Sequence, residues 1–511
     1  MARTERGITG SRATRRRFLV AAGAGTAGVL LVRDTPSWAR TLPVLKSFNG
    51  AMVSNGIQRF HSRPDLQPPH VVIDQQSSRP LPGLIITEVH FGRSQSGPLI
   101  FDQYGRIIWF KPMSPRPSAR QRAFNVHVTE YRGKPVLAWY QGPVVSGHGQ
   151  GSYQIVDTHY RQVAKVHAQH GLMGDLHDLI ITPQGTAIFT CYGQAHGQVG
   201  VNGSIQPVPY WYGVAQEVDI ASGKLLFQWR SDHHISLGSS YGSPAAKLGG
   251  YWDYFHINAV AIDPADQNLV ISARNTATVY KLDRKTGDVI WKMGGKENQF
   301  DMGPGTRFFF QHDVKPHGGG VWTVFDNEGG PPQRGRQSRA LTLSVDERRR
   351  RVRLIRADVH TPPIYANALG SVQPLPGGNT FVGWGASTHF SEYDLHGRSL
   401  FDCHLATGGA NGSLSYRAFL QPWKGLPTAP PDIAVTRSRG KATVYASWNG
   451  AAGLARWIVL RGASHNELSP LGTANVAGFE TGIQLDTSPA AIAVQAVDSD
   501  GRVLATSNTV T

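Results

Sequence analysis

Three histidines and one arginine are the side chains of this sequence best suited to transferring a charged group. His177 lies in DLHDLI, His256 in DYFHINAV, His312 in FFQHDVKPHGGG and Arg274 in ISARNTATVYKLD. An imidazole can attack an electrophile or move a proton near neutral pH, and a guanidinium presents a planar fork of donors to an oxyanion. Taken alone, each histidine has an ordinary structural explanation, a ring satisfied by a neighbouring Asp or backbone group. If the fold brings all four together, they form a cationic pocket for a tetrahedral oxyanion ester.

A repeated hairpin predicts the fold that could bring them together. An apolar strand, an Asp, a polar turn and a second apolar strand recur around Asp102, Asp157, Asp219, Asp283, Asp346 and Asp394. The separations between successive copies are 55, 62, 64, 63 and 48 residues. Near-even units of this size are typical of β-propeller blades. The sequence therefore predicts an all-β protein with a six-bladed β-propeller.

A second repeated pair of strands predicts where the histidines point. When its copies are aligned on their turn, His177, Asn258, His312 and Gly370 occupy equivalent places. We place them on inner strands, which face one central axis. His256 lies two residues before Asn258, so the period of a strand predicts the same face for it.

The residues after the histidines bear on another class of enzyme. A hydrolase or lyase needs paired carboxylates or metal ligands that face the axis. Asp178 and Asp313 directly follow His177 and His312, and the period of two predicts that they face the opposite way.

Composition and sequence segments predict four regions. Residues 1–39 contain TRRRFLVAAGAGTAGVLLV, which is typical of a twin-arginine signal peptide, with Ser37 and Ala39 as small residues before a cleavage site. An uncleaved anchor is the alternative. Residues 40–80 lead into the propeller, and residues 81–426 form it. Residues 427–511 begin Pro-rich and continue as alternating strands, which predicts a small β-sandwich that resembles a fibronectin type III module.

The distribution of charge argues against a nucleic acid partner, and the cysteine content argues against a disulfide framework and a metal-ligand cluster. The formal net charge is +16, but the basic residues are dispersed except for Arg348 to Arg351, so we expect no nucleic acid partner. The two cysteines, Cys191 and Cys403, are far apart, which predicts neither a disulfide framework nor a metal-ligand cluster. No cofactor and no metal are predicted.

An ordered series of motifs gives the chain a family resemblance. Over residues 60–405 the sequence resembles the bacterial arylsulfotransferases through FHSRPDLQPPHVVI, PGLIITEV, GPLIFDQYGRIIW, HDLIITPQG, DYFHINAV, SARNTATVYKLDRKTGDVIWKMGG and QHDVKPHGGG. The resemblance implies a six-bladed propeller that moves a sulfuryl group from a phenolic sulfate ester to a phenol, without a nucleotide sulfate donor. It places the family's sulfated histidine on His312, its supporting histidines on His177 and His256, and its sulfate-binding arginine on Arg274.

Two departures from the family limit this inference. The best-studied branch has an N-terminal dimerisation domain and a disulfide, whereas only about 40 residues here separate the signal from the propeller, and the two cysteines fall in different blades. The sequence therefore predicts neither the oligomeric state nor the acceptor range.

The chemistry of the four side chains suggests a division of roles. Arg274 would stabilise the charge on the sulfuryl oxygens, and a neutral His312 would attack sulfur. Asp313 or a backbone carbonyl would fix the tautomer of His312, and His177 or His256 would protonate the leaving phenolate.

The expected partners are a small phenolic sulfate donor, a phenolic acceptor and, during export, the twin-arginine translocase. The mature protein is then secreted, periplasmic or associated with the cell envelope. Two alternatives remain: a noncatalytic exported binding propeller, and a propeller hydrolase or lyase that acts on an anionic polymer.

Overall fold

Strands make up nearly all the regular structure of the chain. The computed structural model describes residues 42–90, 92–113, 121–201, 204–248, 250–331, 335, 337–406 and 414–511, and the predicted signal peptide lies outside these ranges. Short 3-10 turns occur at Ser231–His233, Leu237–Ser239 and Gly385–Ser387. None of the helical segments described is long and apolar enough to span a membrane. The predicted all-β class is confirmed.

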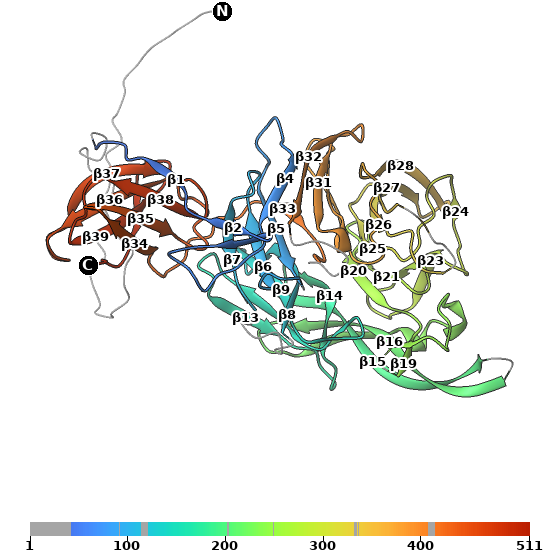
Figure 1. Cartoon of the computed structure of the whole chain (residues 1–511). Coiled ribbons are helices and arrows are strands. Elements are labelled where there is room, and N and C mark those ends of the chain that lie inside the picture. The colour runs from blue at the N-terminus through green and yellow to red at the C-terminus, as the bar shows by residue number, and fades with distance from the viewer. Residues whose placement is uncertain are drawn as a thin grey trace, which may run out of the picture.

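Six antiparallel sheets each contain a run of four strands (Figure 1). The first three runs are β33 (Phe419–Gln421), β5 (Leu84–Val89), β6 (Gly97–Phe101) and β7 (Ile107–Phe110); β8 (Arg122–Tyr131), β9 (Lys134–Gly142), β12 (Ser152–Val156) and β13 (Gln162–Val166); and β14 (Gly174–Ile181), β15 (Thr186–Val201), β16 (Ser204–Asp219) and β17 (Leu225–Arg230). The other three are β20 (Ile257–Ile262), β21 (Leu269–Ala273), β22 (Thr278–Leu282) and β23 (Val289–Gly294); β25 (His312–Pro316), β26 (Val321–Asp326), β27 (Arg339–Asp346) and β28 (Arg351–Asp358); and β29 (Ser371–Pro374), β30 (Thr380–Gly383), β31 (His389–Tyr393) and β32 (Ser399–Leu405).

Short strands extend or accompany these sheets. β4 (Val71–Gln75) lies beside β32, and β24 (Asp301–Met302) lies beside β28. β19 (Tyr251–Asp253) lies beside β16, and β18 (Lys247–Leu248) pairs with the other side of β19. Two separate pairs are β2 (Met52–Ser54) with β3 (Ile57–Arg59) and β10 (Val144–Val145) with β11 (His148–Gly149).

The pairing of β33 with β5 joins the two ends of this six-sheet region. Phe419 lies opposite Ile86, and Gln421 lies opposite Leu84, although more than 300 residues separate the strands in sequence. The first sheet therefore combines strands from the beginning and the end of the region, which is the arrangement that a closed propeller requires.

The repeated Asp residues explain why the outer hairpins form. Each lies at the turn between the third and fourth strand of its sheet. Asp157 Oδ1, for example, accepts hydrogen bonds from the backbone N–H groups of His159 and Arg161 at 2.8 and 2.9 Å. The other five, Asp102, Asp219, Asp283, Asp346 and Asp394, also accept from backbone N–H groups of their turns. A short carboxylate that satisfies turn N–H groups is the local signal that made the repeat visible in the sequence.

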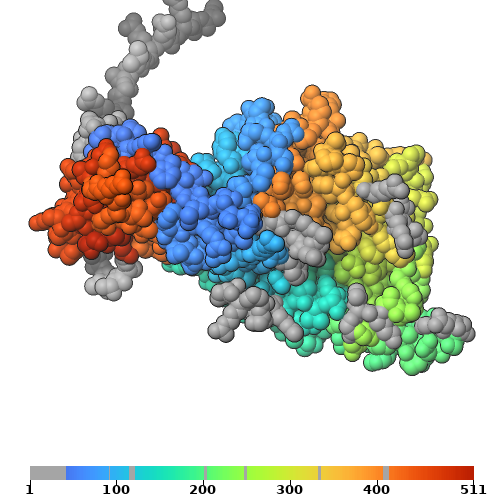
Figure 2. Space-filling view, viewed as in Figure 1, coloured from blue at the N-terminus to red at the C-terminus, as the bar shows by residue number. Residues whose placement is uncertain are grey.

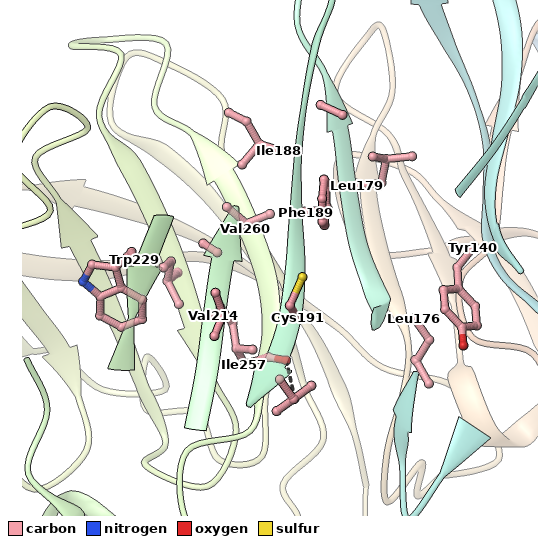
Figure 3. Packing of buried hydrophobic residues seen from close by; sticks show 14 of the residues in the cluster. Tyr140, Leu176, Leu179, Ile188, Phe189, Cys191, Val214, Trp229, Ile257 and Val260 are labelled. Carbon is pink, nitrogen blue, oxygen red and sulfur yellow. Dashed lines mark hydrogen bonds between the residues drawn. The ribbon is translucent and has the colours of Figure 1, made fainter. Parts of the chain in front are cut away.

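Apolar side chains fill the space between neighbouring sheets. Figure 3 shows Cys191 packed among Phe189, Val214 and Ile257, in the largest of the hydrophobic clusters. Cys403 lies in a different cluster, and both cysteines are free. Burial raises the pKa of both thiols well above the ordinary value, so both remain protonated and act as small apolar residues.

Residues after Pro427, together with the N-terminal strand β1, form two further sheets over a shared core. One contains β1 (Ser47–Asn49), β38 (Glu480–Leu485), β35 (Lys441–Ser447) and β34 (Asp432–Ser438), and the other contains β37 (Ser469–Asn475), β36 (Arg456–Gly462), β39 (Ala491–Val497) and β40 (Val503–Thr506). Trp457, Ile483 and Val494 are buried between them. Figure 2 shows this C-terminal part, in red and orange-red, beside the blue N-terminal segment.

The N-terminal segment contributes to both parts of the molecule. β1 adds an edge strand to the C-terminal part, whereas β4 adds one to the sixth sheet. Between them, the buried Glu480 accepts hydrogen bonds from the backbone N–H groups of His61 and Ser62 at 3.1 and 2.6 Å. Residues 42–80 therefore connect the two parts through main-chain contacts.

A buried arginine connects several of the six sheets at their inner strands. Arg417 lies two residues before β33 and its side chain is fully buried. Its Nη1 donates to Asp178 Oδ1 at 2.8 Å, and its Nε lies 3.5 Å from Asp313 Oδ1. Although burial alone would lower the pKa of Arg417, the carboxylate of Asp178 and other nearby groups raise it above its ordinary value. The charge on this guanidinium is therefore permanent.

The same carboxylates also bind the next inner strand. Asp178 accepts from Val260 N at 3.1 Å, and Asp313 accepts from Val372 N at 2.9 Å. The prediction that these two residues face away from the centre was wrong, because both reach Arg417. A bulge explains Asp313: its φ is +48°, and the register of β25 with β26 shifts between His312 and Lys315, so the period of two is broken.

We predict that Arg417→Leu destabilises the six-sheet region strongly. The substitution leaves Asp178 buried without its cation, which costs about 3–5 kcal/mol, whereas Asp313 keeps Lys315 at 2.9 Å. Denaturant unfolding followed by tryptophan fluorescence measures the loss. Arg398→Leu is the matched control, because it removes an Arg that pairs with Asp394 at 2.7 Å but is 77% exposed, so its effect should stay below about 1 kcal/mol. Equal effects of the two substitutions would contradict the role given to Arg417.

Candidate active site

His312 is held as one defined tautomer. It begins β25, is fully buried, and its Nδ1 lies 2.7 Å from Asn327 Oδ1. The amide nitrogen of Asn327 donates to the carbonyl oxygens of Ala366 and Leu369 at 2.7 and 2.9 Å. Since carbonyl oxygens only accept, the amide oxygen must face His312, and Nδ1 must carry the proton. The lone pair of His312 therefore lies on Nε2, where the Leu369 N–H approaches to 3.4 Å.

His177 is paired with a carboxylate from its own strand. Its Nδ1 lies 2.6 Å from Asp175 Oδ2, which also accepts from the His177 backbone N–H at 3.0 Å. Thr190 Oγ1 donates to the same oxygen at 3.0 Å, so the carboxylate is fixed. The Nε2 atom of His177 is left free to exchange a proton with a bound molecule.

His256 reaches the site by a backbone conformation that the strand period did not predict. It lies just before β20 and has a φ of +55°, the left-handed region that is rare for a residue with a side chain. The expectation that it lies on the strand face of Asn258 was therefore wrong. Its Nδ1 lies 2.5 Å from Asp253 Oδ2, and its Nε2 is buried without a hydrogen-bond partner. Such strained conformations are frequent at functional sites.

Arg274 lies at the exposed side of the group. It follows β21, and its backbone N–H donates to the carbonyl oxygen of His256 at 3.0 Å. Its guanidinium stacks 4.8 Å from the ring centre of Phe310 and lies 3.8 Å from Asp253 Oδ2. The side chain is 18% exposed, compared with 3% for those of His177 and His256. A substrate would therefore approach past Arg274.

The structure brings the three predicted rings together. The ring centres of His177 and His256 are 4.8 Å apart, and those of His177 and His312 are 6.4 Å apart. Tyr416 lies next to the group. Its hydroxyl donates to the carbonyl oxygen of His177 at 2.9 Å and lies 3.3 Å from the carbonyl oxygen of Asn258. This residue is next to Arg417, so the buried arginine and the histidine site share one segment of chain.

Burial keeps two of the imidazoles neutral. It lowers the pKa of His256 to about 3, with a further decrease from the nearby charge of Arg274. Burial also holds the pKa of His312 well below its ordinary value, against the opposing effect of the hydrogen bond with Asn327. At physiological pH, both rings therefore offer a lone pair instead of a positive charge.

Several residues of the site were missed by sequence reasoning. Asp175 pairs with His177 and Asp253 pairs with His256, and neither carboxylate was named from the sequence. Both are visible in the motifs DLHDLI and DYFHINAV, two and three residues before the histidine. Asn327, and not Asp313 or a backbone carbonyl, fixes the tautomer of His312, and no spacing in the sequence relates the two residues.

His148 adds a second histidine to the carboxylate of Asp253. Its Nε2 lies 3.3 Å from Asp253 Oδ2, and its ring stacks on Trp211 with ring centres 4.8 Å apart. His148, Asp253 and His256 are close enough to bind a metal ion. However, the 2.5 Å separation of Asp253 and His256 is that of a short charge-assisted hydrogen bond, shorter than the spacing of two ligand atoms on one ion.

Comparisons with known proteins identify a family. The family model described as Arylsulfotransferase (ASST) matches residues 127–406, more than half of the chain. A search of curated proteins gave no match.

Three solved structures illustrate the similarity in fold. A protein of unknown function from Bacteroides caccae is 11% identical, with 66% of this chain and 98% of that chain covered and a TM-score of 0.39. Virginiamycin B lyase from Staphylococcus aureus is 8% identical, with 81% and 98% covered and a TM-score of 0.31. The β-propeller domain of Cps50 (Swd1) from Myceliophteria thermophila is 10% identical, with 71% and 99% covered and a TM-score of 0.31. These likenesses carry no inference about activity.

We predict that the lowered pKa of His256 makes the protein sensitive to acid. Below pH 6.5 the unfolded chain binds a proton at this residue and the folded chain does not, so stability falls as the pH decreases toward the folded pKa of about 3. His256→Gln should reduce the slope of stability against pH by up to about 1.4 kcal/mol per pH unit in this window. Thermal unfolding between pH 7 and pH 4 measures it. The exposed His396, changed to Gln, is the control, and equal slopes for both variants would contradict the assignment.

Proposed function

Because the chain belongs to the arylsulfotransferase family, we propose that it transfers a sulfuryl group from a phenolic sulfate ester to a phenolic acceptor through a sulfohistidine at His312, without a nucleotide sulfate donor. The observation that carries this proposal is the tautomer of His312. Asn327 holds the proton on Nδ1, so the lone pair of Nε2 is the nucleophile. If His312 were only a structural residue, nothing would require its proton to be held on Nδ1 in a site that contains two further histidines.

The first half-reaction forms a nitrogen–sulfur bond. His312 Nε2 attacks sulfur, the bond between sulfur and the aryl oxygen breaks, and its electron pair leaves on the phenolate. Asn327 accepts the hydrogen bond of Nδ1–H while positive charge develops on the ring. Because the ring is neutral before attack, no proton has to be removed from the nucleophile.

The two supporting histidines differ in their suitability as the acid. Both rings have a carboxylate beside Nδ1, Asp175 for His177 and Asp253 for His256. However, burial and the nearby charge of Arg274 lower the pKa of His256. His256 has a pKa of about 3 and is neutral. We assign His177 to protonating the leaving phenolate and, in the second half-reaction, to accepting the proton of the incoming phenol. His256 then orients the phenol through its unpartnered Nε2.

Arg274 stabilises the sulfuryl oxygens. Sulfuryl transfer resembles phosphoryl transfer, in which a loose, in-line transition state spreads charge over the non-bridging oxygens, so cationic hydrogen bonds supply much of the catalysis. The Phe310 ring and Asn275, whose Oδ1 accepts from Arg274 Nε at 3.0 Å, fix the plane of the guanidinium.

The proposal includes the organisation of the whole chain. Six sheets of four strands, joined through β33 and β5, support a six-bladed propeller. The two sheets over one core support a β-sandwich of the fibronectin type III kind. The arginines before Phe18 support export by the twin-arginine pathway. N-terminal sequencing of the exported protein tests this last point, and recovery of only the full-length chain in the cytosol would contradict it.

Steady-state kinetics with two different phenols test the transfer mechanism. We predict ping-pong kinetics, because the first phenol must leave before the second is sulfated. His312→Asn should abolish phenol release from an aryl sulfate and keep the folded structure. His317→Asn is the matched control, because His317 lies just beyond the other end of the same strand and should keep full activity. Phenol release by His312→Asn at the wild-type rate would exclude the mechanism and favour a noncatalytic binding propeller.

We predict that Arg274→Lys lowers kcat by orders of magnitude and not merely substrate affinity. Lys keeps the positive charge but loses the planar fork, so the loss falls on the transition state. Initial rates over a range of aryl sulfate concentrations separate kcat from KM. Arg284→Lys is the control, since Arg284 pairs with Glu217 away from these histidines. A variant Arg274→Lys with raised KM and unchanged kcat would show that Arg274 only binds the substrate.

A further inference from the structure

A second group of histidines and carboxylates lies on the sixth sheet, in residues that the proposed mechanism does not use. His389 begins β31, Asp402 lies on the adjacent strand β32, and His360 lies in the connection between β28 and β29. One potential ligand atom from each of the three lies within 4.8 Å of the others. No metal-ligand cluster was predicted from the sequence because the two cysteines are far apart, and that expectation did not consider these histidines and this carboxylate.

The spacing of these atoms fits a metal ion better than a set of hydrogen bonds. Asp402 Oδ2 lies 3.2 Å from His360 Nε2 and 3.4 Å from His389 Nδ1. A tetrahedral ion with bonds of about 2.0–2.1 Å places its ligand atoms roughly 3.3 Å apart. His389 Nδ1 is buried and has no hydrogen-bond partner. The two separations measured from Asp402 Oδ2 are thus those of one coordination shell, and His389 Nδ1 lacks any hydrogen-bond partner.

A neighbouring pair has a different geometry. His404 Nδ1 lies 2.6 Å from Asp74 Oδ2, although His389 is close to both residues. This separation is that of a hydrogen-bonded ion pair, too short for two ligand atoms on one ion. His404 and Asp74 therefore already satisfy each other and do not need an ion.

The outer partners of the three residues hold them as metal ligands are usually held. His360 Nδ1 lies 2.7 Å from the carbonyl oxygen of Pro362 and donates to it, which leaves Nε2, 3.2 Å from Asp402 Oδ2, as the ring nitrogen available to an ion. Asp402 Oδ1 accepts from Ser391 Oγ at 2.5 Å, and Trp384 Nε1 donates to the same hydroxyl at 2.9 Å. Ligating histidines and carboxylates typically have such second hydrogen bonds, which fix the tautomer and the ring orientation.

We propose that His360 Nε2, His389 Nδ1 and Asp402 Oδ2 bind a divalent transition-metal ion such as Zn²⁺, with a fourth position open to water or a further ligand. Two imidazoles and one carboxylate favour Zn²⁺, Co²⁺ or Ni²⁺ over Ca²⁺ and Mg²⁺, which require mostly oxygen ligands. His360 Nε2 lies within hydrogen-bond distance of Asp402 Oδ2, so any proton on that nitrogen has to leave when the ion binds, and the ion takes the place of this hydrogen bond.

The ion would anchor the segment that supports His312. His360 lies near the start of the connection between β28 and β29, and Leu369 lies near its end. Ala366 and Leu369 supply the carbonyl oxygens that orient Asn327, and the Leu369 N–H approaches His312 Nε2. A metal on His360 therefore fixes one end of a segment whose other end sets the tautomer of His312. This consequence for catalysis rests on the proposed function, whereas the binding of the ion does not.

Direct binding of Co²⁺ tests the site. The full-length mature protein is prepared without a histidine tag, freed of metal with EDTA, and titrated with Co²⁺ while its visible absorption is recorded. We expect one bound Co²⁺, displaced by Zn²⁺, and a rise in the thermal unfolding temperature on binding. His360→Gln and His389→Asn should each weaken binding by at least about tenfold. Asp402→Asn keeps the shape of the side chain and serves if a histidine variant does not fold.

Three control variants locate the ion. His396→Asn, in the exposed turn of the same hairpin, should bind like the wild type. His404→Asn and His148→Asn test the other two clusters and should also keep the bound Co²⁺. Absence of Co²⁺ binding by the wild type, or unchanged binding by both His360→Gln and His389→Asn, would overturn the proposal. Loss of binding in His404→Asn or His148→Asn alone would assign the ion to another place and overturn it as well. None of these outcomes depends on sulfuryl transfer.

Discussion

The ion-pair network around Arg417 is the interaction on which the rest of the structure depends. One buried guanidinium from the C-terminal end of the six-sheet region contacts Asp178 of the third sheet and lies 3.5 Å from Asp313 of the fifth. Each carboxylate also accepts an N–H from the inner strand of the next sheet. Removing Arg417 would leave Asp178 buried and unpaired, at a cost comparable to much of the stability of a domain, although Asp313 would keep its ion pair with Lys315. The network therefore holds the inner strands at a fixed separation.

The histidine site is built directly on this network. His177 and His312 are the residues just before Asp178 and Asp313, and Tyr416, beside Arg417, binds the carbonyl oxygen of His177. Arg417 and Tyr416 thus hold the backbone of the two strands that carry these histidines. Burial keeps His256 and His312 neutral, while Arg274, at the exposed side, carries the positive charge that an anionic ester meets first. Stability and chemistry are thus divided between adjacent residues of the same strands.

Local signals explain what the sequence could predict. The turn Asp residues made six hairpins visible, because a carboxylate at a turn acts over two to four residues. His177 and His312 followed from a second repeated pair of strands. His256 followed from its spacing to Asn258, and Arg274 from the family resemblance. Asn327 could not be found in this way, since its orientation is set by carbonyl oxygens some 40 residues later. Bulges were also invisible: the left-handed φ of His256 and Asp313 breaks the strand period, and Arg417 lies outside any repeat. The sequence did not predict the interactions between sheets, because no local pattern contains them.

The central claim is that His312 Nε2 forms a covalent bond with the transferred sulfuryl group. Incubation with an aryl sulfate in the absence of acceptor, followed by denaturation at neutral to alkaline pH and mass measurement of the intact chain and of its peptides, tests this claim most directly. The account predicts a mass gain of one SO₃ group per active molecule, located on His312 and lost when a phenol is added before denaturation. An active protein that gains no such mass, or gains it on another residue, would contradict the account.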